Sequence, residues 1–301
     1  MSLGFVPHSL SNSDDEEEQE SYDNTDTHLP SKFSLYQQSV QSPKGDISYL
    51  QMFFLTYVGG RAPLHLQEDF CGTALLRAPL HLQEDFCGTA LLSTEWLRSD
   101  LRRTSVGLDF DLDALDWCIE NNVNKVGLIY LLESSSTMVT SYNHKKLNCR
   151  HELVSYFKHA LNALSKKGGI FVMDLYGGTS SECELKMQRK FPNFTYTWEQ
   201  AGFDIIQRKT RISLHYTLLN HQKKKLRHAF SYSWRLWSLP EIKDCMEEAG
   251  FRSVHFWIRQ MPDSENIKSM EGFGSARDIK YEEVTSFQQQ DSWNAYIVAV
   301  S

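Results

Sequence analysis

The sequence predicts an α/β protein built on a mostly parallel sheet, with helices on both faces and an antiparallel final strand. Two observations favour this class. Residues 80–111 read as a strand, a tight turn at Gly88, a helix and a second strand that ends at Asp109. Residues 170–176 form a continuous apolar run closed by two glycines, which is typical of a strand buried on both faces.

The other elements are predicted from hydrophobic periodicity and from turn signals. Asp111 is a good N-cap for the next helix, and Ser238 begins a capping-box pattern that starts a later one. Further helices are expected at 34–41, 47–57 and 153–164, and further strands at 126–132, 194–198, 203–218, 226–237, 254–259 and 295–300. The period-two segments between 194 and 237 predict an antiparallel excursion from the main sheet.

The spacing between the turn and the acid predicts a site for an adenosine-bearing ligand. Gly88 precedes Asp109 by 21 residues. In open parallel sheets such a turn lets the backbone come close to a bound ligand. An acid that ends the next strand accepts hydrogen bonds from the ribose hydroxyls of that ligand. Phe86 and Ala90 stand where a dinucleotide turn has further glycines, so a pyrophosphate fits poorly. A sugar with a thioether or sulfonium arm fits better.

These residues resemble the motifs of class I S-adenosylmethionine-dependent methyltransferases. The resemblance covers roughly residues 33–301 and rests on three segments in order: Glu-Asp-Phe-Cys-Gly-Thr at 84–89, Gly-Leu-Asp-Phe-Asp at 107–111, and Tyr-Ser-Trp-Arg-Leu-Trp-Ser-Leu-Pro-Glu at 232–241. It implies a Rossmann-like sheet, S-adenosyl-L-methionine as cofactor, and an inserted antiparallel segment on the substrate side at about 194–237.

The resemblance also implies site residues. Glu84 and Asp85 would lie beside the methionyl end of the cofactor, and Asp109 would hold its ribose. The implied cofactor-binding residues are Glu84, Asp85, Phe86, Cys87, Gly88, Thr89, Asp109, Phe110 and Asp111. Asp85 and Asp111 are explained equally well as helix caps. The implied substrate-side residues are Tyr36, Asp174, Tyr176, Trp198, Tyr232, Trp234, Arg235 and Trp237. For the aromatic ones a place in the core is the commoner explanation, and Tyr36 reads equally well as a surface tyrosine.

Methyl transfer from a sulfonium depends on orientation and water exclusion, so it needs no covalent enzyme nucleophile and no metal. We therefore assign no catalytic residue and no metal ligand. The methyl acceptor is not identified, although a small molecule is favoured. One alternative is a catalytically inactive binding or interaction protein with the methyltransferase fold. Another is a nicotinamide-dependent oxidoreductase, which the missing glycines at 86 and 90 disfavour.

A sixteen-residue repeat interrupts the pattern, since residues 61–76 and 77–92 are both RAPLHLQEDFCGTALL. Two short copies do not make a solenoid, and they indicate a tandem duplication or an error in the gene model. We place the site in the second copy, because Gly72 precedes Asp109 by 37 residues. The first copy is expected to be an extruded loop or a stray helix. Residues 123–150 are barely enough for a third strand, a crossover helix and a fourth strand. This short segment and the repeat could both impair the methyl transfer that the resemblance implies.

The formal net charge of −7 belongs to the beginning of the chain. Residues 1–30 contain eight acids and no Lys or Arg, which predicts a disordered acidic tail before a single domain at 31–301. The remainder is close to neutral, so there is no strong nucleic-acid signal. No signal peptide and no apolar run long enough to span a membrane are found, and no cysteine spacing indicates a disulfide framework. An intracellular protein, cytoplasmic or nuclear, is expected, and its oligomeric state is left open.

Overall fold

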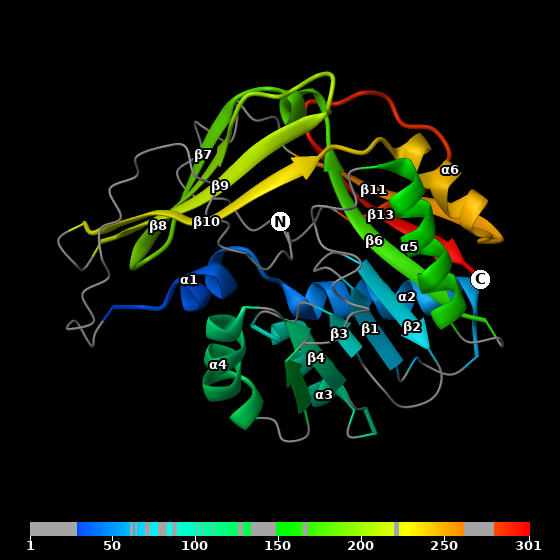
Figure 1. The fold of residues 1–301 in the computed structure, drawn as a ribbon, viewed down its shortest axis with the longest axis horizontal. Coiled ribbons are helices and arrows are strands. Elements are labelled where there is room, and N and C mark those ends of the chain that lie inside the picture. Colours follow the sequence, from blue (N-terminus) through cyan, green and yellow to red (C-terminus); the bar gives the residue numbers. More distant parts are fainter. Residues whose placement is uncertain are drawn as a thin grey trace.

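The fold is taken from a computed structural model (Figure 1). It describes residues 29–60, 63, 65–69, 73–77, 83–85, 89–100, 102–103, 105–109, 111–125, 129–133, 149–164, 168–219, 223–261 and 280–301. Most of the predicted acidic tail lies outside these ranges. Among the described residues, no helix is both long and apolar enough to cross a membrane.

The main sheet has nine strands in the order β12-β11-β13-β6-β2-β1-β3-β4-β5. The strands are β1 (His65–Asp69), β2 (Thr73–Arg77), β3 (Gln83–Asp85), β4 (Ser105–Asp109), β5 (Ile129–Glu133), β6 (Ile170–Gly177), β11 (Ser253–Gln260), β12 (Glu282–Val284) and β13 (Trp293–Val300). Pairings β1–β3, β3–β4 and β4–β5 are parallel. The other five pairings between described strands are antiparallel. The expected parallel arrangement is thus found on one side of the sheet only, while the final strand is antiparallel as predicted.

The two copies of the repeat lie side by side in this sheet. Residues 67–69 of β1 pair in parallel and in register with residues 83–85 of β3. Strand β2 of the first copy then turns back and pairs with both β1 and β6. The expectation of an extruded loop or stray helix is therefore wrong. The physical reason is backbone pairing: among the described residues between α4 and α5, β5 is the only strand, and the hairpin supplies the hydrogen-bonding edge that β3 and β6 need.

Helices cover both faces of the main sheet. They are α2 (Pro43–Tyr57), α3 (Leu91–Ser99), α4 (Leu112–Asn121), α5 (Arg150–Ala163) and α6 (Leu239–Ala249), whereas α1 (Lys32–Ser39) packs elsewhere. Successive side chains of a strand point to opposite faces, so β6 has two apolar sides. Ile170 and Val172 join the core formed with α2 and α3, whereas Phe171 joins the core formed with α5 and α6.

A second sheet is inserted between β6 and α6. Its order is β10-β9-β8-β7, all antiparallel, with strands β7 (Leu185–Lys190), β8 (Phe194–Gln200), β9 (Lys209–Leu218) and β10 (Lys225–Arg235). The sequence predicts the last three of these strands. It misses β7, because that strand is at the sheet edge and has polar residues at most positions. Helix α1 packs against this sheet through Phe33, Leu35 and Tyr36.

Candidate functional site

The predicted cofactor-binding acids lie at the carboxyl ends of two adjacent parallel strands. Asp85 ends β3 and pairs with Leu108, so Asp109 at the end of β4 lies one position further along. Neighbouring strands are about 5 Å apart, which puts these two positions at one corner of the sheet edge. Glu84 lies one position earlier on β3, opposite Gly107. The predicted residues Phe86, Cys87, Gly88 and Phe110 lie outside the described residues.

The turn after β3 is held from two sides at Thr89. Its buried hydroxyl donates a hydrogen bond to Gln41 Oε1 at 2.9 Å, and its carbonyl oxygen accepts one from Asn122 Nδ2 at 2.6 Å. Ala90 comes next in the left-handed conformation, with φ 48°, and starts α3 as its N-cap. A positive φ is uncommon for a residue with a side chain, so the turn holds Ala90 in a conformation that glycine adopts more readily. Sequence reasoning missed Gln41 and Asn122, because no local motif marks either residue.

Asp111 is the N-cap of α4. Its carboxyl group accepts a hydrogen bond from the backbone nitrogen of Ala114 at 3.2 Å. The capping role is therefore confirmed, and a contact with a cofactor stays a prediction. A carboxylate in this place also interacts favourably with the partial positive charge of the helix amino end.

Helix α1 packs between α4 and the four-stranded sheet (Figure 1). The Phe33 ring lies 5.8 Å from the ring of Trp117 on α4 and 6.1 Å from that of Phe230 on β10. Tyr36 is buried, with its ring 5.1 Å from that of Phe230. The reading of Tyr36 as a surface tyrosine is therefore wrong. The leading segment forms part of the core between the two sheets.

Four of the predicted substrate-side residues come together as an aromatic group, consisting of Tyr176, Trp198, Tyr232 and Trp234. The Tyr176 ring lies 6.3 Å from Trp198 and 5.9 Å from Trp234, and Tyr232 stacks on Trp234 at 5.3 Å. Among the described residues, no group hydrogen-bonds the buried Tyr176 hydroxyl. Burial raises the pKa of this hydroxyl, so it stays protonated. This group joins the end of β6 to the antiparallel sheet.

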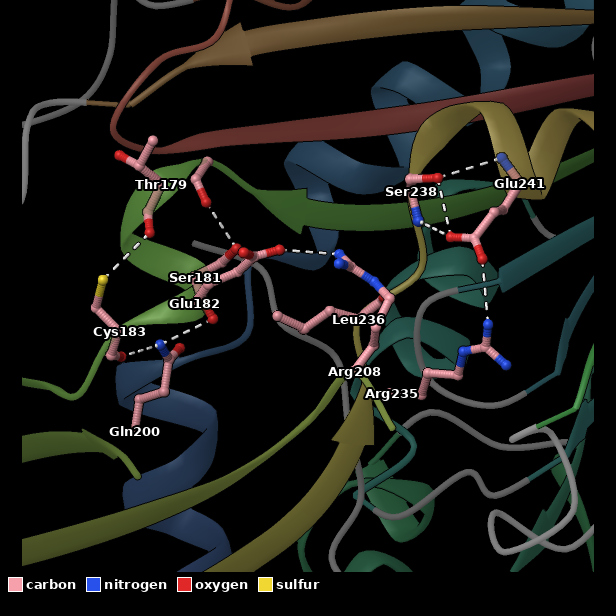
Figure 2. A network of polar contacts seen from close by, with 11 residues as sticks. Thr179, Ser181, Glu182, Cys183, Gln200, Arg208, Arg235, Leu236, Ser238 and Glu241 are labelled. Atoms are coloured by element: carbon pink, nitrogen blue, oxygen red, sulfur yellow. Dashed lines mark hydrogen bonds and ion pairs between the residues drawn. The ribbon is translucent and has the colours of Figure 1, made fainter. Parts of the chain in front are cut away.

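Arg235 and Trp237 do not join the aromatic group. The Arg235 guanidinium lies 3.7 Å from the centre of the Trp237 ring and pairs with Glu241 at 3.1 Å. Trp237 packs against the core formed with α5 and α6. Both side chains are thus engaged at the start of α6, where Ser238 and Glu241 form the predicted capping box (Figure 2).

A polar network fixes the antiparallel sheet to the end of β6 (Figure 2). Gln200 Nε2 donates to the backbone oxygens of Ser180, Ser181 and Cys183 at 3.0, 3.0 and 2.6 Å. Arg208 pairs with Glu182 at 2.9 Å and donates to the backbone oxygen of Leu236 at 3.2 Å. The segment after β6 is therefore tied to the end of the inserted sheet at which β8 ends and β9 begins, which holds the aromatic group in a fixed place.

Asp174 lies two residues before Tyr176, on the face of β6 that α2 covers. It is opposite Tyr296 on β13, whose hydroxyl donates to Asp46 Oδ1 at 2.7 Å. Asp174 as a whole residue is half-buried, whereas its carboxyl group is buried. Burial of its carboxyl, with a smaller contribution from the negative charge of Asp46, raises the pKa of Asp174 well above its usual range.

Comparisons with known proteins agree with this geometry at the level of the fold. A scan against protein-family models and a search of curated proteins find no match. Among solved structures, an S-adenosylmethionine-dependent methyltransferase from Clostridium acetobutylicum matches with a TM-score of 0.52 at 14% identity, over 88% of this chain and 96% of that one. DesVI from Streptomyces venezuelae matches with a TM-score of 0.43 at 10% identity, over 85% and 89% of the two chains. The PH0226 protein from Pyrococcus horikoshii matches with a TM-score of 0.40 at 11% identity, over 87% and 92%.

The first of these matches spans nearly all of both chains, so it includes the main sheet and the inserted one. Identity this low establishes the fold and not the reaction. The motifs at 84–89 and 107–111 lead independently to the same family. The chain therefore has the mixed α/β fold of the class I S-adenosylmethionine-dependent methyltransferases.

Proposed function

We propose that residues 31–301 act as one domain that transfers a methyl group from S-adenosyl-L-methionine to an acceptor by in-line displacement. The observation that carries the proposal is the placement of Asp85 and Asp109 at adjacent carboxyl ends of parallel strands. This is the position at which open α/β sheets bind ligands. The likeness to solved methyltransferases supports the fold on which the proposal depends.

The residues at this edge fit the cofactor. In this proposal, Asp109 accepts hydrogen bonds from the ribose, and Glu84 and Asp85 interact with the positively charged amine. The left-handed Ala90 bends the chain directly before α3, which leaves the amino end of that helix facing the same edge. When bound, the cofactor supplies a methyl group activated by its sulfonium. The chain's own contribution is to orient the two reactants and to exclude water.

The substrate side of the proposal consists of Asp174, Tyr176, Trp198, Tyr232 and Trp234, with α1 and Tyr36 closing the core beside them. Three of the rings lie within about 6 Å of one another across β6, β8 and β10, as their centroid distances of 6.3, 5.9 and 6.3 Å indicate. Arg235 and Trp237 support this wall from the start of α6 and are not proposed to contact the acceptor.

Calorimetric titration with S-adenosylmethionine and with its demethylated product tests the proposal. We expect both to bind the wild-type chain, and Asp109→Asn to weaken binding at least about tenfold, because hydrogen bonds to a charged acceptor are lost. Asp113→Asn removes the same charge from an exposed position on α4 and should leave binding within about twofold. Absence of binding at millimolar cofactor would overturn the proposal, and tighter binding of a nicotinamide dinucleotide would favour an oxidoreductase.

Turnover separates an active enzyme from an inactive binding protein. Protein that binds the cofactor is incubated with radiolabelled S-adenosylmethionine and mixtures of small metabolites, and transfer of label is measured. Label in any acceptor supports methyl transfer. Cofactor binding without transfer to any of them would instead support the inactive binding protein.

A further inference from the structure

The inserted sheet has a strong excess of positive charge. Between Leu185 and Arg235 the sequence has eleven Lys and Arg residues and only two acids, Glu199 and Asp204. The chain after residue 30 is close to neutral as a whole, so its other residues are nearly as negative as this segment is positive. The charge of the domain is therefore unevenly distributed, and the inserted sheet is its basic part.

The two faces of the inserted sheet differ in character. Helix α1 packs on one face, where Phe194, Leu214 and Phe230 are buried (Figure 1). Successive side chains of a strand point to opposite faces, so the residues beside these three belong to the opposite face, which we call the outer face. The charged residues of the described strands on the outer face are Lys186, Lys190, Glu199, Arg211, Lys225 and Arg227.

The cations of the outer face gather toward one end of the sheet. One row of paired residues runs from Lys190 on β7 through two threonines to Lys225 on β10. Lys223 and Lys224 come directly before Lys225, and all three are exposed. Arg227 follows two positions later on the same strand and is exposed as well. A group of exposed cations so close together favours a partner with several carboxylates.

Glu199 is the acid of the outer face, and it already has a partner. Its carboxylate accepts a hydrogen bond from Lys186 Nζ at 2.5 Å, which lowers the pKa of Glu199 and keeps it charged. Glu199 therefore offsets one cation and leaves the others. Within the described part of the chain, Arg211, Lys225 and Arg227 form no ion pair.

The opposite charge is found at the beginning of the same chain. Residues 1–28 lie outside the described residues. From Asp14 to Asp26 the sequence has eight acids and no Lys or Arg. This nearly matches the excess of positive charge between Leu185 and Arg235. The acidic segment, defined as residues 14–26, is thus complementary in charge to the outer face.

The described chain begins beside the inserted sheet. Leu29 packs with the core on the α1 side, and Lys32 Nζ lies 5.6 Å from the centre of the Phe230 ring on β10. Strand β10 is an edge of this sheet, so the outer face is reached by passing this one strand. Asp14 is fifteen residues before Leu29. Fifteen residues span at most about 54 Å, whereas four strands are only about 15 Å across, so the acids can reach the whole face.

A nucleic acid fits the outer face less well than this segment. Proteins that bind single strands combine cations with aromatic side chains on which the bases stack. In the described strands β7 to β10, every Phe, Tyr and Trp belongs to the core on the α1 side. A segment of the same chain also has a high effective concentration, because it is tethered to the surface that it binds.

We propose that the acidic segment binds the outer face of the inserted sheet in the same chain, through Arg211, Arg227 and the lysines at 223–225. The inference goes beyond the proposed function and does not depend on it. Each exposed ion pair contributes little, so the contact depends on several pairs together and on the tether. It should therefore weaken with salt. While bound, the segment keeps other polyanions away from this face.

Carbodiimide cross-linking of the full chain tests the contact, because the reagent joins a carboxylate directly to a lysine amine. We expect mass spectrometry to find the acidic segment joined to the lysines at 223–225 at least about ten times as often as to Lys158, which is exposed on α5. This yield should fall severalfold in about 0.5 M salt. The cross-link between Lys186 and Glu199 is the internal reference and should persist, since the folded sheet holds that pair together.

Heparin, a polyanion, measures whether the acidic segment occupies the face. Neutralising this segment in the full chain should raise the affinity for heparin at least about tenfold, because a competitor is removed. The substitutions are Asp14→Asn, Asp15→Asn, Glu16→Gln, Glu17→Gln, Glu18→Gln, Glu20→Gln, Asp23→Asn and Asp26→Asn. Adding Lys223→Gln, Lys224→Gln, Lys225→Gln and Arg227→Gln should cancel the gain. The matched control adds four substitutions at exposed cations elsewhere and should keep most of the gain: Lys44→Gln, Lys158→Gln, Arg252→Gln and Lys280→Gln.

Three results would overturn the inference. One is a cross-linking yield spread evenly over the exposed lysines. Another is cross-linking only between separate chains, which a mixture of unlabelled and isotope-labelled protein reveals and which would assign the face to a second copy. The third is an affinity for heparin that the substitutions in the acidic segment leave unchanged, which would show that the face is already open to polyanions. An unchanged circular dichroism spectrum and melting temperature show that each variant is folded.

Discussion

Thr89 Oγ1 donates a hydrogen bond to Gln41 Oε1 at 2.9 Å, which ties the connection between α1 and α2 to the turn that precedes α3. Because Thr89 is buried, water cannot readily replace this hydrogen bond when it is lost. The leading segment and the predicted cofactor turn should therefore respond together when this contact is removed.

Thr89→Val keeps the shape of the side chain and removes the donor. We expect a loss of about 1–3 kcal/mol in the free energy of unfolding, measured by urea denaturation, together with weaker cofactor binding. Thr56→Val is the control, because Thr56 is exposed and its hydroxyl donates to the backbone oxygen of Met52 within α2, and a change below about 0.5 kcal/mol is expected. Equal effects of the two substitutions would show that the hydrogen bond between Thr89 and Gln41 contributes nothing to the free energy of unfolding.

Asp174 should make stability depend on pH. Its folded-state pKa is raised by burial and by Asp46, so the folded chain holds this proton more tightly than the unfolded one. The stabilising contribution is complete below the unfolded pKa of about 4 and is lost as the pH rises through the raised folded pKa. Besides Asp46, Tyr281 and Tyr296 are the titratable groups that interact with Asp174, and Tyr49 and Arg259 lie beside Tyr281.

Asp174→Asn should remove this dependence. Denaturation is measured at a series of pH values, and the variant is expected to gain stability over wild type as the pH rises above about 4. Asp244→Asn, at an exposed position of α6, should match the wild-type profile. Parallel profiles for wild type and Asp174→Asn would show that the Asp174 pKa is not raised.

Gly178 is required by the backbone at the end of β6. It has φ 115° and ψ 172°, a region that side-chain-bearing residues essentially do not occupy. An added Cβ would also clash with the backbone oxygen of Asp291. Gly178→Ala should therefore lower the free energy of unfolding by more than about 3 kcal/mol. Gly45→Ala, where the nearest atom is Ser42 Oγ at 3.5 Å in a helix, should instead be neutral or stabilising.

Removal of one copy of the repeat should leave a folded chain. Deleting 61–76 or 77–92 gives the same polypeptide, because the copies are identical. Strands β3 and β6 run in the same direction, since β1 is parallel to β3 and antiparallel to β2, which is antiparallel to β6. They can then pair directly as parallel neighbours. We expect cooperative thermal unfolding and cofactor affinity at least equal to that of the full chain, and an unfolded product would contradict this.

The sequence predicts elements well where the signal is local. The capping box at Ser238, the N-cap at Asp111 and the apolar run from Ile170 all appear where expected. Prediction from the sequence fails where the pairing of strands decides which element a segment forms. Thr-Ala-Leu-Leu is in strand β2 in the first copy, whereas its two leucines begin helix α3 in the second, so tertiary context overrides the local preference.

The site is predictable only in part for the same reason. The strand-end acids are found from spacing, and the register of β3 with β4 puts the positions of Asp85 and Asp109 at the same corner of the sheet edge. Gln41 and Asn122 come from segments 48 and 33 residues away from Thr89, and no spacing rule relates them to it. Likewise, Asp46 meets Tyr296 only because α2 lies across the sheet.

Strands β1 and β3 carry the same residues at paired positions, so nothing in the hydrogen bonds between them distinguishes one from the other. Their order across the sheet is fixed only by the segment that comes after each strand: a return strand after Asp69, and the turn into α3 after Asp85. Asp69 ends β1 directly beside Asp85 of β3, so the carboxyl edge of the sheet contains the same strand end twice. A substitution in the first copy therefore also alters this edge, next to the strand that leads into α3.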